Sequence, residues 1–272
     1  MTHNKMIILF KALVICLVMY SLALVYLYIF QSRILYRPGS DNPFTHDYAP
    51  FVSFVYQTPA GMNMRGMWYP PQANKPIIIY FQGNTGSIGT RLFKARKFIT
   101  KGYGVAMVGY RGYSGNPGFP SEKNLMDDGR AAIDALVKKG YKPSQMILYG
   151  ESLGSGIAVR MAYEQPDIRA VILEAPYTSI AAVAKSRFAI FPVNKLLKDR
   201  FDSAKIIHNL QMPVLVLHGT HDKTTSVEIG HDLFSKVTAK KKQFISLNGA
   251  GHADLYDHGA ERVIDEFLAQ AI

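Results

Sequence analysis

Residues 146–154 read MILYGESLG, and this stretch sets the fold that the sequence predicts. The apolar run 146–149 is typical of a buried strand, and the stretch Ile157–Tyr163 that follows is typical of a helix. A serine between two glycines on so short a strand-to-helix turn is expected to have a strained backbone and an outward-pointing hydroxyl. Side chains at positions 150 and 154 would collide with the turn, which explains both glycines.

Apolar runs on both sides of this motif alternate with helical stretches. Runs that are apolar on both faces indicate a mainly parallel sheet, covered by helices on both sides. The expected strands are 51–57, 62–69, 76–81, 105–109, 146–149, 170–173, 213–217 and 243–247, and the expected helices are a stretch ending near 100, 125–139, 157–163 and 261–271. The sequence therefore predicts an α/β fold, in which functional groups collect in loops at the carboxyl ends of the strands.

The composition narrows the class of protein. With 272 residues, 48% of them hydrophobic and 19% charged, the chain is neither disordered nor of low complexity. Its single cysteine, Cys16, excludes a disulfide framework and a cysteine-ligated metal site, and no motif requires a metal or another cofactor. The net charge of +11 indicates either a solvated basic face, to which Lys240–Lys242 and the run from Arg91 to Lys101 contribute, or contact with anionic lipid. No nucleic-acid recognition motif accompanies the charge, and no pattern specifies an oligomeric state.

The N-terminus is the most apolar part of the chain. Residues 6–30 read MIILFKALVICLVMYSLALVYLYIF, and the 19 uncharged residues from Ala12 to Phe30 would form a helix of about 28 Å, long enough to cross a bilayer. This run is longer than the apolar core of a signal peptide, and no small-residue cleavage site follows, so we expect an uncleaved anchor. A cleaved signal and a buried core helix are the alternatives. Residues 31–50 then predict a linker, and residues 51–272 predict one domain.

The charges that flank this anchor are balanced. Lys5 and Lys11 lie on one side, and Arg33 and Arg37 lie on the other. The positive-inside rule therefore leaves open on which side of the membrane the domain lies.

The serine of the motif needs a base, and the base needs an acid that orients it. In this architecture the acid and then the histidine follow the serine along the chain. Asp222 comes just after the expected strand 213–217, and His252 follows the next strand in a glycine-flanked loop. Ser152, Asp222 and His252 are thus the predicted nucleophile, acid and base.

The remaining histidines and nearby acids are alternatives. We expect His218 to pack in the core or a turn, His221 to point away from the site, and His258 to begin a helix. His3, His46, His208 and His231 are expected at the surface. Asp254, Asp257 and Glu174 stay open as alternatives to Asp222, although each is more simply a solvated or capping carboxylate.

Acyl-transfer chemistry also needs two backbone N–H donors for the oxygen that becomes negative in the transition state. One is expected from Leu153, the residue after the serine, at the start of a helix whose dipole favours negative charge. The other is expected from Asn84 in the loop 82–87, QGNTGS, which follows the strand 76–81. That loop lacks the Gly-Lys-Ser/Thr ending of a phosphate-binding loop.

Five motifs together resemble the α/β-hydrolase superfamily. They read FQGNTG at 81–86, YRGYSG at 110–115 with PSE at 120–122, GESLG at 150–154, HGTHD at 218–222 and GH at 251–252. They are most similar to its Bem-like branch of small hydrolases, which an N-terminal transmembrane helix often anchors. The resemblance implies serine-hydrolase chemistry on Ser152, Asp222 and His252, with relatives acting on esters, thioesters or acylated proteins. Two positions depart from the branch: Gln82 replaces its usual histidine, and Thr224-Thr225 replaces its usual Val-Pro.

The segment 177–211 lies where such hydrolases insert a lid. Its apolar residues either line an acyl site or pack the lid down: Phe188, Ile190, Phe191, Val193, Leu196 and Leu197. The predicted function is that of a membrane-anchored serine hydrolase, which cleaves an ester or thioester through an acyl-enzyme on Ser152. The expected substrate is a small molecule, a lipid or another acylated compound. A peptidase or amidase with the same triad, and a non-catalytic scaffold of this fold at the membrane, are the alternatives.

Overall fold

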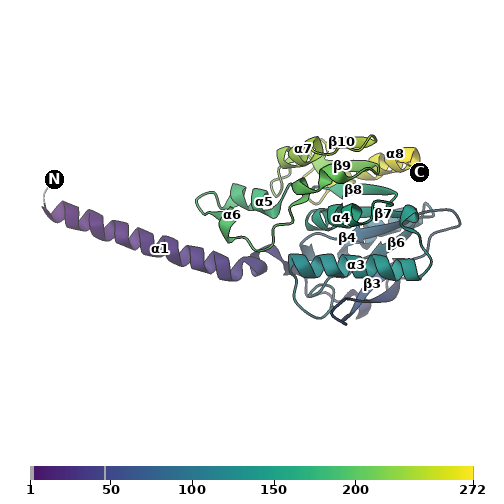
Figure 1. The fold of residues 1–272 in the computed structure, drawn as a ribbon, viewed down its shortest axis with the longest axis horizontal. Helices are drawn as coiled ribbons and strands as arrows, with labels where there is room; N and C mark the ends of the chain where they lie inside the picture. Colours follow the sequence, from purple (N-terminus) through teal and green to yellow (C-terminus); the bar gives the residue numbers. More distant parts are fainter. Residues whose placement is uncertain (1–2, 46, 272) are drawn as a thin grey trace.

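A computed structural model describes residues 3–45 and 47–271 of the chain, and its centre is an eight-stranded sheet (Figure 1). The strands are β2 (Val52–Gln57), β3 (Asn63–Tyr69), β4 (Ile77–Phe81), β6 (Gly104–Met107), β7 (Met146–Glu151), β8 (Ala170–Glu174), β9 (Val214–Gly219) and β10 (Lys242–Leu247). Their order in the sheet is β10-β9-β8-β7-β4-β6-β3-β2. The strands from β10 to β6 run parallel, whereas β3 pairs antiparallel with both β6 and β2. The predicted fold class is confirmed.

Helices cover both faces of this sheet. On one face α2 (Leu92–Ile99) and α8 (Ala260–Ala271) pack their apolar sides, and on the other face α3 (Glu122–Lys138), α4 (Leu153–Glu164) and α7 (Val227–Ser235) do so. Every residue of the central strands β4 and β7 is buried, because each strand contributes side chains to both apolar layers. Short 3₁₀ turns complete the domain: η1 (Pro43–Thr45), η2 (Ile88–Arg91), η3 (Pro143–Gln145), η4 (Ser203–Lys205), η5 (Ile207–Asn209) and η6 (Leu255–His258).

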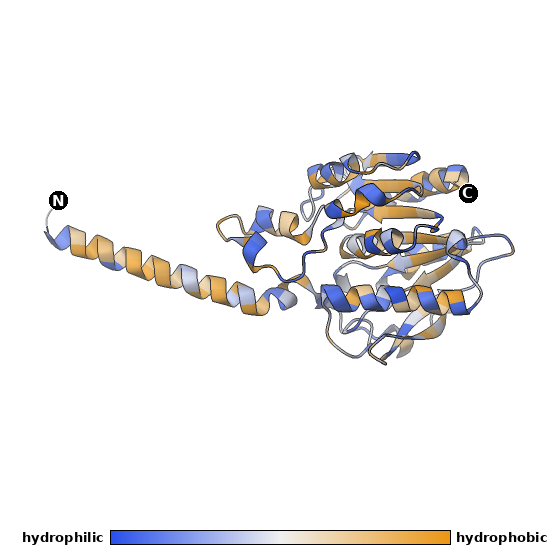
Figure 2. Cartoon of the chain, in the orientation of Figure 1, coloured by the Kyte–Doolittle hydropathy of each residue, from blue (hydrophilic) through white to orange (hydrophobic). Residues whose placement is uncertain are grey.

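The N-terminal helix α1 (His3–Leu35) projects away from this domain (Figure 1). Its most apolar window has a mean hydropathy of 2.5, with none of that window buried, and Figure 2 shows the apolar colouring along most of its length. It is therefore long and apolar enough to cross a membrane. The helix extends beyond the predicted segment 6–30 at both ends, because no helix-breaking residue occurs before Pro38.

The predicted linker 31–50 is attached to the domain. After α1 ends, β1 (Arg37–Pro38) pairs parallel with β5 (Thr85–Gly86), a short strand of the loop that contains Asn84. Tyr36 and Pro43 are buried. His46, one of the four histidines expected at the surface, lies outside the described residues. The segment is therefore more than a tether, because its backbone hydrogen bonds join α1 to one loop of the domain.

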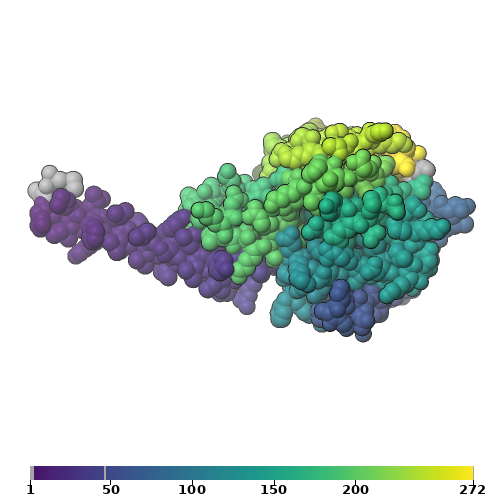
Figure 3. All heavy atoms as spheres, in the orientation of Figure 1, coloured from purple at the N-terminus to yellow at the C-terminus, as the bar shows by residue number. Residues whose placement is uncertain are grey.

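The predicted lid, residues 177–211, contains α5 (Ile180–Arg187), α6 (Val193–Leu196), η4 and η5. It lies between the sheet and α1, and its atoms contact the last turns of α1 in Figure 3. The lid and α1 therefore lie on the same side of the domain.

Candidate active site

Ser152 lies on the sharp turn between β7 and α4. Its backbone has φ 49° and ψ −115°, a conformation that a non-glycine residue rarely adopts, and its N–H donates to the Glu174 carbonyl at 2.8 Å. A Cβ on Gly154 would lie 2.1 Å from the Phe81 carbonyl oxygen, and one on Gly150 would lie 2.6 Å from the Gly154 carbonyl oxygen. Both glycines are thus required sterically, as the motif predicts.

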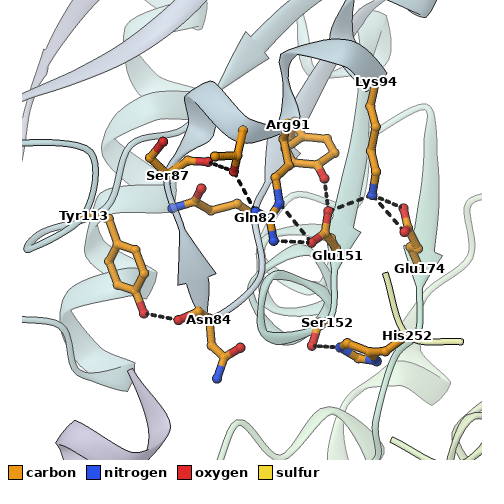
Figure 4. Close-up of polar contacts among 12 residues, drawn as sticks. Gln82, Asn84, Ser87, Arg91, Lys94, Tyr113, Glu151, Ser152, Glu174 and His252 are labelled. Atoms are coloured by element: carbon orange, nitrogen blue, oxygen red, sulfur yellow. Dashed lines mark hydrogen bonds and ion pairs between the residues drawn. The ribbon is translucent and has the colours of Figure 1, made fainter. Parts of the chain in front are cut away.

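The structure places Ser152, His252 and Asp222 in one hydrogen-bonded chain. His252 Nε2 lies 2.9 Å from Ser152 Oγ, and His252 Nδ1 lies 2.7 Å from Asp222 Oδ2 (Figure 4 shows the Ser152–His252 contact). When Nδ1–H donates to Asp222, the Nε2 lone pair faces the serine hydroxyl and can accept its proton. The side chain of Asp222 is fully buried, and that of His252 is 22% exposed, so the base is open to the site.

Asp222 is held in its ionised form by several donors. Burial alone would raise its pKa, but hydrogen bonds from His218 and His252 outweigh that effect and hold the pKa well below its usual range. The backbone N–H groups of Thr224 and Thr225 donate to Asp222 Oδ1 at 2.7 and 2.9 Å. The Thr225 bond explains one departure from the family pattern, because a proline at this position has no N–H to donate.

The other histidines and acids have other contacts. His218 is buried, as expected, and its Nε2 lies 2.7 Å from the Thr225 carbonyl oxygen and 3.4 Å from Asp222 Oδ2, so it supports the acid's loop. Asp254 accepts from the Gly251 N–H at 2.7 Å, and Glu174 contacts Lys94. Of the candidate acids, only Asp222 contacts His252 in the part of the chain that the structure describes.

The loop that carries Asn84 is fixed from outside the catalytic core. The Asn84 carbonyl accepts from the Arg37 N–H at 2.9 Å and from the Tyr113 hydroxyl at 3.0 Å (Figure 4). Its side-chain Nδ2 donates to the Leu35 carbonyl at 2.7 Å. Within the described residues the backbone N–H groups of Asn84 and Leu153 make no hydrogen bond, and both residues line the pocket at Ser152. They have the free donors that an oxyanion hole needs.

Gln82, the other departure from the family pattern, lies at the start of this loop. It is fully buried, and among the described residues neither atom of its side-chain amide has a hydrogen-bond partner. Its carbonyl accepts from the Tyr110 hydroxyl at 3.1 Å. The polar contacts that hold the loop at this position are therefore made by the main chain.

A buried ionic cluster behind Ser152 is missed by the sequence reasoning. Glu151 and Glu174 are in register at the ends of β7 and β8, and Lys94 Nζ contacts both carboxylates at 2.7 and 2.8 Å (Figure 4). Arg91 also contacts Glu151, at 3.1 Å. Burial alone would raise the pKa of Glu151, but Lys94 and Arg91 outweigh it and lower that pKa to about 2. Two cations assigned to a basic surface by sequence are thus partners of buried acids.

The pocket at Ser152 has a volume of about 370 Å³, within the range of small-molecule sites. Ser152, His252, Asn84 and Leu153 line it, together with apolar residues of the lid and α1 and with Arg37, Arg91 and Arg187. Of the six apolar lid residues, all except Ile190 line it: Phe188, Phe191, Val193, Leu196 and Leu197.

A mainly parallel sheet with a strained serine after a central strand, and an acid and a histidine after later strands, defines an α/β hydrolase. A family model described as "Serine aminopeptidase, S33" matches residues 72–206. Protein bem46 of Schizosaccharomyces pombe is 31% identical over 72% of this chain and 68% of its own length. The chain therefore belongs to the α/β-hydrolase superfamily.

Two further similarities are consistent with this membership. The lysophosphatidylserine lipase ABHD12 of Danio rerio is 29% identical over 73% of this chain and 57% of its own length. The Pyrococcus furiosus esterase Pf2001 has the same fold, with a TM-score of 0.67 and 16% identity over 87% of this chain and 98% of that structure.

Proposed function

We propose that this protein is a serine hydrolase that cleaves a carboxylic ester or thioester through an acyl-enzyme on Ser152. The observation that carries the proposal is the chain of contacts from Ser152 Oγ through His252 to the buried Asp222 carboxylate. The apolar pocket that opens at the serine suits the acyl group of such a substrate.

The reaction takes two steps. Ser152 Oγ attacks the acyl carbon while His252 Nε2 takes its proton, and the backbone N–H groups of Asn84 and Leu153 stabilise the negative oxygen. The bond from carbon to the leaving oxygen or sulfur breaks as His252 returns that proton to the leaving group. Water then attacks the acyl-enzyme, giving a proton to His252, and Ser152 leaves with that proton as the free acid is released.

The pocket argues against an aminopeptidase, the activity that the family description prints. An aminopeptidase needs an acidic group to bind the substrate's α-ammonium. Among the described residues the one carboxylate that lines the pocket is Glu151, and Arg91 and Lys94 already pair with it. The apolar walls and the lipase relative favour an ester with an acyl chain.

We also propose that α1 anchors the enzyme in a membrane. Its length, apolar surface and lack of burial support this, with Tyr26, Tyr28 and Phe30 near one end as interfacial anchors. The full-length protein is expected to stay in the membrane pellet after carbonate extraction. Recovery in the supernatant would contradict the anchor.

Labelling with a fluorophosphonate tests the serine-hydrolase proposal. Wild type is expected to be labelled, whereas Ser152→Ala and His252→Ala are expected to lose labelling. Ser155→Ala is the matched control, because Ser155 lies one turn further along α4, is buried and makes no side-chain hydrogen bond within the described residues. An unlabelled but folded wild type, or a labelled Ser152→Ala, would refute the proposal.

A further inference from the structure

One stripe of α1 contacts the lid. The Tyr20 hydroxyl donates to the Ile190 carbonyl at 2.9 Å, and the Tyr20 ring stacks on Phe191 with the ring centres 5.3 Å apart. Three turns later, Gln31 donates to the Leu196 carbonyl and accepts from the Lys198 N–H at 2.8 Å. The lid therefore lies along α1 from Tyr20 to Gln31, and Figure 3 shows the lid atoms against this end of the helix.

This contact lies beside the part of α1 that would cross the bilayer. Tyr20 is ten residues before Phe30, the last apolar residue of the expected anchor, and at 1.5 Å per residue this is about 15 Å along the helix. Since the hydrocarbon core of a bilayer is about 30 Å thick, a membrane that contains α1 also surrounds the lid tip, residues 188–193.

The lid tip has the chemistry of a membrane-inserted loop. It reads FAIFPV, Ile190 is 74% exposed, and basic residues flank it at Lys185, Arg187, Lys195 and Lys198. Apolar residues between basic flanks are typical of segments that bind the interface of an anionic membrane.

Part of its backbone is already hydrogen-bonded. The N–H groups of Phe188, Phe191 and Val193 donate within the lid, Pro192 has none, and Tyr20 donates to the Ile190 carbonyl, whereas within the described residues the N–H groups of Ala189 and Ile190 make no hydrogen bond. These bonds lower the cost of taking an irregular loop into lipid.

The same two elements wall the pocket. Leu27 and Ile34 of α1 and Phe191 and Leu197 of the lid line the same pocket as Ser152. An acyl chain that leaves the hydrocarbon beside α1 would therefore stay against apolar side chains until its carbonyl reaches the serine.

We propose that the lid tip enters the same leaflet as α1, and that the pocket takes the acyl chain of a lipid from that leaflet to Ser152. This inference rests on the proposed function, because it names the substrate class of the same site. It makes the membrane helix a wall of the acyl site as well as an anchor.

Tryptophan fluorescence tests the insertion. Ile190→Trp in the full-length protein is expected to be quenched by vesicles of brominated phosphatidylcholine with phosphatidylserine, above the background of Trp68, the single native tryptophan. Val137→Trp is the control, because Val137 is 45% exposed near the end of α3, about 22 Å along the helix from the contact between Glu122 and the lid residue Asp199. Equal quenching of the two variants would overturn the insertion.

The enzyme's preference for acyl-chain length tests whether α1 forms a wall of the pocket. Leu27→Trp fills the pocket, so the ratio of kcat/KM for the p-nitrophenyl palmitate ester to that for the butyrate ester is expected to fall about tenfold or more. Ile29→Trp is the control, since Ile29 is 60% exposed and does not line the pocket. An unchanged ratio in Leu27→Trp would overturn the role of α1. Fluorophosphonate labelling and butyrate hydrolysis by wild type report separately on the proposed function.

Discussion

At the scale of single residues, the backbone of Ser152 has φ 49° and ψ −115°, a strained conformation that directs the serine side chain out of the turn. A Cβ on Gly154 would collide with Phe81, and one on Gly150 would collide with the turn itself. Because these collisions are local, a short stretch of sequence is enough to predict the turn. Asp222 and His252 follow from chain order and strand ends. By contrast, the support that His218 gives to Asp222 depends on a side-chain direction that no sequence pattern shows.

Replacing Asp222 with asparagine tests the assignment of the acid. An amide would favour the wrong tautomer of His252, so kcat is expected to fall by about 10⁴-fold. The matched variant Asp254→Asn removes a carboxylate that contacts the Gly251 N–H, and it is expected to keep most of the activity. Steady-state kinetics on a soluble ester distinguish the two. If Asp254→Asn were the inactive variant, the assignment would be wrong.

At the scale of elements, the segment after α1 and the Asn84 loop act as one unit. Composition predicts a linker for residues 31–50, because proline, glycine and polar residues are typical of linkers. The pairing of β1 with β5 joins positions almost fifty residues apart, and such long-range contacts leave no local pattern. For the same reason the sequence predicts a surface position for Lys94, although its buried partners lie on β7 and β8.

The hydrogen bonds that the Asn84 carbonyl accepts from Arg37 and Tyr113 predict an effect on catalysis. Tyr113→Phe removes a donor to the Asn84 carbonyl, and the loss of a hydrogen bond worth about 1 kcal/mol is expected to lower kcat several-fold with KM nearly unchanged. Tyr56→Phe is the control, because the Tyr56 hydroxyl contacts the Gly109 carbonyl instead. Equal kcat values for Tyr113→Phe and wild type would show that the Tyr113 hydrogen bond does not position the backbone N–H of Asn84.

The buried cluster predicts an effect on stability. Lys94→Met leaves Glu174 without its ion-pair partner, and breaking a buried pair costs about 3–5 kcal/mol. Lys97→Met, one turn along α2, removes a pair whose lysine side chain is 40% exposed and is expected to cost about 1 kcal/mol or less. Denaturant unfolding followed by Trp68 fluorescence measures both. Similar losses in the two variants would contradict the structural role of Lys94.

At the scale of the whole molecule, the buried carboxylates set the response to acid. The pKa values of Glu151 and Asp222 are lower in the folded protein than usual, so the stability they contribute is present above about pH 4 and is lost as the pH falls below it. Asp128 acts in the opposite direction, because burial raises its pKa to about 6 against the hydrogen bonds from Arg111. Below about pH 4 Asp128 is protonated in both the folded and the unfolded protein. Only the loss of the stability that Glu151 and Asp222 contribute therefore remains.

The denaturant midpoint of the full-length protein in detergent is therefore expected to fall steeply between about pH 4 and pH 2. Measurements at half-unit steps would show it. A midpoint that stays constant over this range would mean that these carboxylates are not held ionised in the folded state.

Trapping of the acyl-enzyme is the decisive test of Ser152 as the nucleophile. The full-length protein is mixed with a p-nitrophenyl ester, quenched during the initial burst, digested, and analysed by peptide mass spectrometry. We expect one acyl group per active molecule, on Ser152, with none formed by His252→Ala. Turnover without an acylated Ser152 peptide, or acylation of another residue, would contradict it.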